Sequence, residues 1–361
     1  MLKVLMLPLN VASFPVISCK ALNNISGIKA KCVTQSLSKY QETSEDLIYL
    51  PREVPKRKIF KWIRHQLTGK STLKKLVKEA DVLHYYWGPA YPNASDLRWA
   101  RSFNKPVVVE WLGSDIRNPE VLKAYNPYFA RVYENGYEYR ENESAENSQK
   151  VQKFFSCVNA TPVLCPEMSL FLDRQLFPAF RLIFQRIQCM DIIPEYPLVS
   201  KQRPLIVHSP SAIYAKGTNF ILPAIEELRK ELDFDFVLLH NITRQEVLET
   251  IKSADIIIDQ LVIGGYGMAA VEGMAHGKPV LSYIMPAVFE AGLPADCPII
   301  NTNSDNLKDN LKKLIQDAQL RHETGKKSRV YAEQYHDADK IALQLANIYR
   351  DVIRAVPIKN T

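Results

Sequence analysis

Short apolar runs alternate with longer stretches in which apolar residues recur every three or four positions. A short apolar run bounded by turn residues is typical of a strand buried on both faces, and the longer pattern is typical of a helix with one buried side. Their alternation indicates strand-helix-strand units and parallel sheets, an α/β fold. The strands are expected at 3–9, 31–33, 48–50, 82–86, 106–112 and 161–165, and then at 205–209, 235–239, 255–260 and 279–283.

Helical patterns fill the gaps between these strands. A stretch from 125 to 155, rich in Tyr and Glu and nearly free of Gly and Pro, predicts a long helical excursion with an acidic side. The other clear helices are expected at 218–231, 244–253, 268–276 and 337–354.

The segment 192–204 carries three prolines and no periodicity, which is typical of a linker between domains. A chain of 361 residues exceeds what one hydrophobic core usually serves, so two domains are expected. We place them at 1–196 and 197–336, each with strand and helix patterns of its own.

Composition restricts the class of protein further. The chain is 47% hydrophobic and 24% charged, a composition typical of soluble globular proteins. A helix that crosses a bilayer needs about 20 consecutive apolar residues, and every apolar run in the chain is shorter. The six cysteines are scattered without a C-x-x-C pair, so buried thiols in a reducing compartment are expected rather than disulfides or a metal knuckle. We therefore expect a cytoplasmic protein.

The net charge of +7 is concentrated in one stretch, 52–78, which holds ten Lys and Arg residues and a single acid, Glu53. Interleaved apolar residues, Phe60 and Trp62 among them, give the stretch an apolar side. Two interpretations remain open: a basic helix on the inner face of an anionic membrane, or a solvated helix beside a cleft for phosphorylated ligands. No nucleic-acid recognition motif accompanies the charge.

The segment 254–283 holds the most specific pattern, a buried strand followed by a glycine-rich turn and a helix. Glycines at 264, 265 and 267 would let a ligand approach the backbone closely. Glu272, about one turn into the helix, can accept hydrogen bonds from a pair of ribose hydroxyls. The free amides at the helix start form a site suited to a diphosphate, and they belong to Gly267, Met268 and Ala269.

Four further segments run off expected strand ends into loops, where open α/β sheets place their ligands. The segment 208–218 carries Lys216 before a helix. The segments 81–88 and 106–117 supply polar and aromatic side chains, and the loop after the first strand lacks glycines but has polar residues. The residues of interest in these last three loops are His84, Glu110, Trp111, Ser114, Asp115, Asn10 and Ser13.

The segments 254–283, 208–218 and 106–117 resemble the retaining glycosyltransferases of family four, of the bacterial surface-polysaccharide type, which have the GT-B fold. That family carries two glutamates eight residues apart around a Gly-Phe-Gly-like turn, an Arg with a Lys-Gly pair, and a His near the reacting sugar. Here the second glutamate is Glu272 and the lysine is Lys216. The first glutamate, the arginine and the histidine fall on Gly264, Ser211 and Leu112.

The resemblance implies two Rossmann-like domains across a cleft and a last helix, 337–354, that packs back on the first domain. It implies retaining transfer of a sugar from a UDP- or GDP-linked donor, without a metal, to a glycan or lipid-linked acceptor. The expected donor site consists of Ser211, Lys216, Gly265, Tyr266, Gly267, Met268, Ala269 and Glu272. The expected catalytic residues are Asp115, Glu110 and His84, and the expected acceptor residues are Asn10, Ser13 and Trp111.

Two other functions are compatible with the three departures from the family pattern. One is a non-catalytic protein of the same fold that binds a nucleotide or supports a partner enzyme. The other is a nucleotide-sugar 2-epimerase-like enzyme built from two similar domains.

Overall fold

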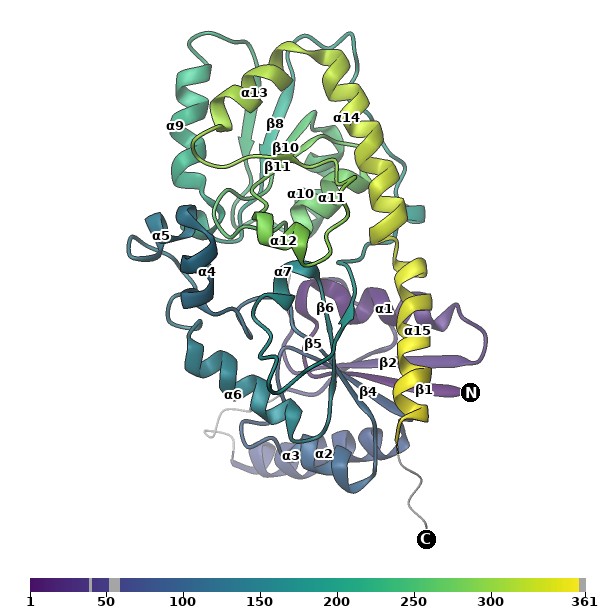
Figure 1. Ribbon diagram of the computed structural model, residues 1–361. Helices are drawn as coiled ribbons and strands as arrows, with labels where there is room; N and C mark the ends of the chain where they lie inside the picture. The colour runs from purple at the N-terminus through teal and green to yellow at the C-terminus, as the bar shows by residue number, and fades with distance from the viewer. Residues whose placement is uncertain (39–40, 52–58, 357–361) are drawn as a thin grey trace.

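The computed structural model describes residues 1–38, 41–51 and 59–356, and within helix α2 it describes side chains from residue 68 onward. The chain forms two parallel β-sheets, each with helices on both faces (Figure 1). We call the parts of the chain around the two sheets the first and the second domain. Among the described residues, no helix is long and apolar enough to span a bilayer.

The first sheet has seven strands in the order β3-β2-β1-β4-β5-β6-β7, and the second has five in the order β12-β11-β10-β8-β9. The strands of the first are β1 (Leu2–Leu7), β2 (Ile28–Thr34), β3 (Leu47–Tyr49), β4 (Val82–Tyr86), β5 (Val107–Glu110), β6 (Thr161–Leu164) and β7 (Arg181–Leu182). Those of the second are β8 (Leu205–His208), β9 (Asp235–Leu238), β10 (Ile256–Ile258), β11 (Val280–Ser282) and β12 (Ile300–Asn301). The parallel α/β fold expected from the alternating pattern is confirmed.

The helices connect these strands. In the first domain they are α1 (Phe14–Asn23), α2 (Ile59–Glu79), α3 (Ser95–Ser102), α4 (Pro119–Tyr125), α5 (Pro127–Tyr133), α6 (Ala145–Ser156) and α7 (Pro166–Ser169). In the second they are α8 (Ile213–Lys216), α9 (Thr218–Leu228), α10 (Arg244–Ser253), α11 (Met268–Ala275), α12 (Pro286–Glu290), α13 (Leu307–Gln316) and α14 (Ala318–Tyr331), and α15 (Ala338–Arg354) follows.

Residues 4–7 of the central strand β1 are all apolar, without the alternation of apolar and polar residues that a half-exposed strand would have. Leu5 and Leu7 belong to one hydrophobic core, and Val4 and Met6 belong to another on the opposite face of the sheet. Because successive side chains of a strand point to opposite faces, a strand covered on both faces needs apolar residues at every position. Two layers of helices therefore enclose the first sheet.

The region 125–155 differs from its prediction, because it is not one helical excursion. Asn126 precedes Pro127 and adopts an extended backbone (φ −138°, ψ 95°), which ends α4, and its side chain caps α5. A loop containing Gly136, with φ of +107°, then separates α5 from α6. The helices α4 and α5 reach up beside the second domain (Figure 1).

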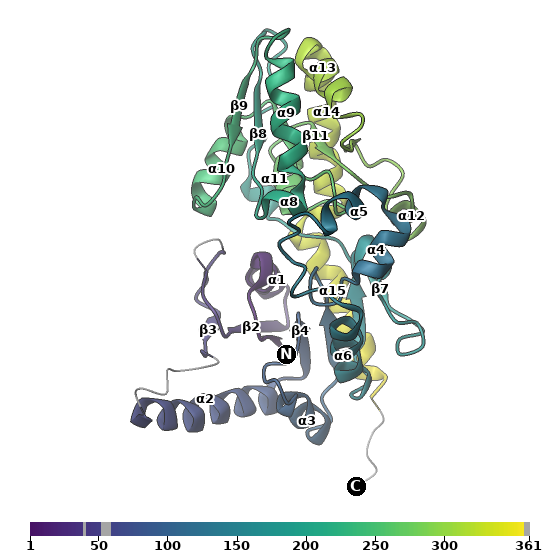
Figure 2. The same ribbon diagram turned by 90° about the vertical axis from the view of Figure 1, so that its left-hand side faces the viewer.

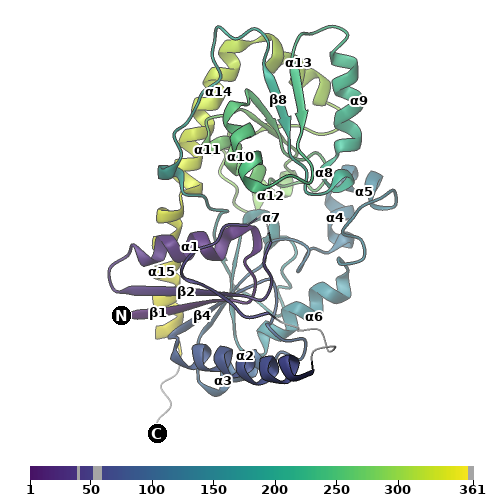
Figure 3. The ribbon, with the colours of Figure 1, turned by 180° about the vertical axis from the view of Figure 1, so that it is seen from behind.

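After the second domain, α15 returns to the first and lies along α1 (Figures 1 and 3). Its residues Ile341, Leu345 and Tyr349 are buried in the same core as Val4 and Met6. An amphipathic helix from the far end of the chain thus covers one face of the first sheet.

Two leucines of α15 provide a test of this packing. Leu345 is 0% exposed and Leu343 is 56% exposed. We expect Leu345→Ala to lower the free energy of unfolding by about 2–5 kcal/mol, because it leaves a cavity against the sheet. Leu343→Ala should change it by less than about 0.5 kcal/mol. Urea unfolding measures both, and equal losses would contradict the packing.

Candidate functional site

Two adjoining cavities lie at the carboxyl ends of the strands. One, of about 430 Å³, is lined by the second domain and reaches from Glu272 to Lys216. The other, of about 410 Å³, lies between the domains and is lined by loops that follow β1, β4, β5, β6, β8 and β10. The two cavities share Ser211, Lys216 and Met268 on their walls.

Two side chains, those of Asp259 and Gln260, hold the glycine-rich turn after β10 through hydrogen bonds. Asp259 Oδ2 accepts a hydrogen bond from the Gly267 amide at 2.6 Å, and Gln260 Nε2 donates to the Gly265 carbonyl at 2.5 Å. Lys216 Nζ donates to Gln260 Oε1 at 2.8 Å, which fixes the ammonium group beside the start of α11. The structure therefore places Lys216 where a diphosphate at this helix start would need a cation.

Asp259 changes one detail of the expected anion site. Its carboxylate already accepts from the Gly267 amide, so that amide is engaged. The next two amides, those of Met268 and Ala269, lie in the first turn of α11, where the helix itself offers no acceptor. Met268 and Ala269 also line the second-domain cavity.

Glu272 projects from α11 to the wall of the second-domain cavity and pairs with Arg244 at 2.5 Å. Burial raises the pKa of Glu272, and the charge of Arg244 opposes that shift. Arg244 also contacts Glu42 of the first domain at 3.3 Å. Arg244 was not expected at the site, because it meets these two carboxylates only through packing between distant parts of the chain.

The two expected acceptor residues of the first loop are directed elsewhere. Asn10 Nδ2 donates to the Glu42 carbonyl at 2.8 Å, and Ser13 Oγ accepts from the Glu42 amide at the same distance. Both side chains thus hold the backbone of Glu42, the residue that meets Arg244. Their neighbours Val11 and Ala12 line the cavity between the domains.

Two of the expected catalytic residues, His84 and Glu110, form one buried polar cluster. Both oxygens of Glu110 accept from Arg186, at 2.9 and 2.6 Å. Burial alone would raise the pKa of Glu110, but the charge of Arg186 and the hydrogen bonds with His84 and Arg186 together lower the pKa. His84 Nδ1 lies 2.7 Å from the Tyr349 hydroxyl of α15, and burial lowers its pKa. Of the two, only Glu110 reaches the wall of the cavity between the domains.

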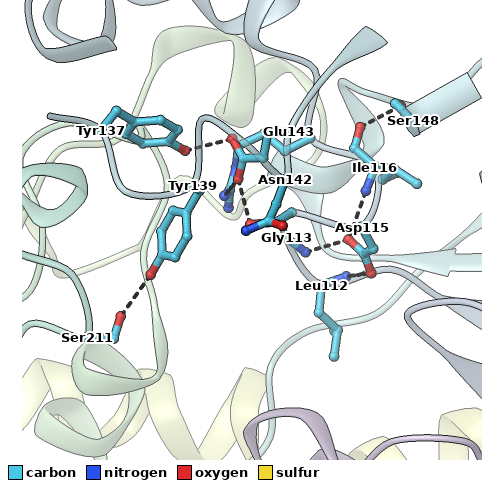
Figure 4. A network of polar contacts seen from close by, with 12 residues as sticks. Leu112, Gly113, Asp115, Ile116, Tyr137, Tyr139, Asn142, Glu143, Ser148 and Ser211 are labelled. Atoms are coloured by element: carbon cyan, nitrogen blue, oxygen red, sulfur yellow. Dashed lines mark hydrogen bonds and ion pairs between the residues drawn. The ribbon is translucent and has the colours of Figure 1, made fainter. Parts of the chain in front are cut away.

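The third, Asp115, organises its own loop (Figure 4). Its carboxylate accepts hydrogen bonds from the amides of Leu112, Gly113 and Ile116 at 2.8–3.0 Å. Burial raises its pKa to about 6. It is absent from the walls of both cavities, whereas Leu112 and Gly113 line the one between the domains. Asp115 is therefore placed to position the loop.

Trp111 is fully buried and meets Phe155 and Phe177 edge-on, away from the cavities. Three polar residues that the sequence analysis did not single out do line the cavity between the domains: Arg117, Tyr139 and Glu167. The guanidinium of Arg117 pairs with Glu143 at 2.6 Å, and the Tyr139 hydroxyl meets Ser211 Oγ at 3.2 Å across the two domains (Figure 4).

The buried pair of Glu110 and Arg186 can be tested against a surface pair. We expect Glu110→Gln to lower the free energy of unfolding by about 3–5 kcal/mol, because it leaves Arg186 buried without a counter-charge. Glu134 pairs with Arg140 at the surface, so Glu134→Gln should cost less than about 1 kcal/mol. Denaturant unfolding gives both values. Wild-type stability in Glu110→Gln would show that Glu110 does not serve the fold.

The chain is similar to several solved structures of two such domains. Sucrose-phosphate synthase from Thermosynechococcus elongatus matches with a TM-score of 0.65 at 15% identity, over 98% of this chain and 100% of that one. The Anabaena protein HepE, solved in complex with UDP and glucose, matches with a TM-score of 0.63 at 14% identity, over 96% of this chain and 99% of that one. A glycosyltransferase from Rickettsia africae matches with a TM-score of 0.61 at 14% identity, over 100% of this chain and 99% of that one.

No protein-family model and no curated protein matches the sequence. The structural likeness covers nearly the whole chain in each case, at identities that show the fold alone. The chain therefore has the GT-B architecture expected from its sequence, with two Rossmann-like domains across a cleft.

Proposed function

We propose that this protein is a glycosyltransferase that moves a sugar from a nucleotide-sugar donor to a glycan or lipid-linked acceptor. The observation that carries the proposal is the pair of cavities that meet at Lys216. The second-domain cavity would hold the nucleoside, with Glu272 at the ribose. The diphosphate would lie at Lys216, and the sugar would enter the cavity between the domains. The similar structure of HepE holds UDP and glucose, which supports a nucleotide-sugar donor.

The reaction would rest on stabilising the leaving group. The bond from the sugar carbon to the diphosphate oxygen breaks, and negative charge develops on the diphosphate. Lys216 and the amides of Met268 and Ala269 would stabilise that charge without a metal. For a retaining transfer, the acceptor hydroxyl attacks from the same face, and its proton passes to the departing diphosphate. The donor base would be uracil or guanine.

We expect Lys216→Ala and Glu272→Ala each to weaken UDP or GDP binding by about tenfold or more, because each removes a charge-assisted contact. Glu226 and Lys230 are exposed and remote from the cavities, so their alanine variants serve as matched controls. Calorimetric titration measures affinity, and circular dichroism confirms folding. Wild-type affinity in both site variants would remove the proposed donor site.

Product analysis separates the proposed function from its two alternatives. Incubation with a sugar nucleotide and a mixture of glycan acceptors should yield a new glycoside. An isomerised sugar nucleotide would identify an epimerase. Binding without any product would identify a non-catalytic protein of the same fold.

We also propose that the basic stretch 52–78 holds the protein on an anionic membrane surface near a lipid-linked acceptor. Residues 52–58 lie outside the described residues, but α2 lies on the side of the first sheet away from the second domain (Figure 2). Among the residues of α2 whose side chains the structure describes, 68–79, none lines the two cavities at the donor site, so these residues do not support the alternative of a basic cleft rim. Leu73 and Val77 are buried, and four lysines of the same helix are exposed: Lys70, Lys74, Lys75 and Lys78.

Vesicle co-sedimentation tests this proposal. Lys74, Lys75 and Lys78 are exposed, and about 1 kcal/mol for each lysine predicts that their triple change to Gln weakens binding to phosphatidylserine vesicles about a hundredfold at low salt. The same triple change at Lys326, Lys327 and Lys340 should have little effect. Wild-type protein that ignores anionic vesicles at low salt would contradict the proposal and favour a soluble acceptor.

A further inference from the structure

The turn after β10 has no room for a glutamate at the place where the resemblance puts one. Gly264 has φ of +87°, a backbone conformation that residues other than glycine rarely adopt. A Cβ there would stand 2.4 Å from Met285 Cγ and 2.9 Å from Asn126 Nδ2. A glutamate at 264 is therefore incompatible with this arrangement of the domains.

Asn126 is not free to give way. It belongs to the first domain, it is fully buried, and its Nδ2 donates to the Val262 carbonyl of the second domain at 2.6 Å. Its Oδ1 accepts from the amides of Tyr128 and Phe129 at the start of α5. The first domain thus places beside Gly264 a side chain whose Nδ2 and Oδ1 atoms are both hydrogen-bonded.

A carboxylate from the first domain stands over the next residue of the turn instead. Glu167 lies on α7, directly after β6, and α7 lies between the two sheets (Figures 1 and 3). A Cβ on Gly265 would stand 1.7 Å from Glu167 Oε2. Residue 265 must be glycine, because a larger side chain there would overlap with the Glu167 carboxylate.

Glu167 is placed for a ligand. It lines the cavity between the domains together with Lys216 and Gly267, at the junction with the second-domain cavity. In the part of the chain that the structure describes, it forms no direct ion pair. Burial raises its pKa to about 7, against the charges of Arg117 and Lys216. A half-buried carboxylate without a paired cation can accept hydrogen bonds from neighbouring hydroxyls, which a sugar supplies.

We propose that Glu167 contacts the hydroxyls of the transferred sugar, so that the first domain supplies the carboxylate that the turn of the second domain lacks. This inference rests on the proposed function. The sugar would lie beyond Lys216, between Glu167 and the loop that follows β5. Donor recognition would then be completed only when the two domains are together.

The test compares nucleotides with and without a sugar. Wild-type protein, Glu167→Gln and Glu138→Gln are titrated with UDP, GDP, UDP-glucose, UDP-galactose, UDP-N-acetylglucosamine and GDP-mannose. Glu138 is the matched control, because its carboxylate also crosses between the domains, to the amides of Tyr214 and Ala215 at 2.8 and 2.9 Å. The measured quantity is the Kd of the preferred sugar nucleotide divided by the Kd of its parent nucleotide.

We expect Glu167→Gln to raise this ratio by about tenfold or more, because the amide keeps the shape but loses the charge and one accepting oxygen. Its affinity for the parent nucleotide should stay at the wild-type value, which also shows that the variant is folded. Glu138→Gln should leave the ratio unchanged. An unchanged ratio in Glu167→Gln, or an equal rise in both variants, would overturn the role of Glu167 while leaving the proposed function intact. Wild-type protein that binds none of the six compounds would overturn the proposed function itself.

Discussion

The close approach of the two domains at the turn after β10 is the constraint on which the site depends. Two adjacent glycines, Gly264 and Gly265, have no Cβ, and neighbouring side chains fill the space this leaves. Met285 of the second domain and Asn126 of the first lie against Gly264, and Glu167 of the first domain lies against Gly265. The cavity between the domains, and the position of Glu167 on its wall, depend on this approach.

Several polar contacts span the domains beside a shared hydrophobic core. Arg131 pairs with Asp305 at 2.7 Å, and Arg244 contacts Glu42 at 3.3 Å, both at least partly exposed to solvent. Exposed pairs of this kind contribute about 0–1 kcal/mol each, so water replaces them at little cost. Asn126 is the buried exception, and it lies at the glycine turn.

Much of the fold could be predicted from the sequence, because the strands are apolar on both faces and the turns between them carry strong signals. The strands from Val82 to Tyr86 and from Leu205 to His208 lie within a residue of their predicted bounds. The short strands β7 and β12 could not be predicted, since two residues show no periodicity. The helical stretch from 125 was wrong because Pro127 ends α4 at Asn126, a local effect that its composition masked.

The site was partly predictable for a related reason. Lys216 and Glu272 stand in segments whose local pattern is distinctive, and the structure brings both to the cavity walls. Arg186, Arg244 and Glu167 stand in segments without such a pattern. Each meets its partner or its cavity only through packing between distant parts of the chain, so a local pattern could not identify them.

The return of α15 to the first domain also affects how the protein is made. Val4 and Met6 are translated before the second domain, yet the helix that covers them is translated after it. At about 5–20 residues per second, that face of the sheet waits on the order of tens of seconds for its cover. During synthesis the nascent first domain therefore presents an apolar surface that chaperones can bind, and its folding is completed only after the second domain has been translated.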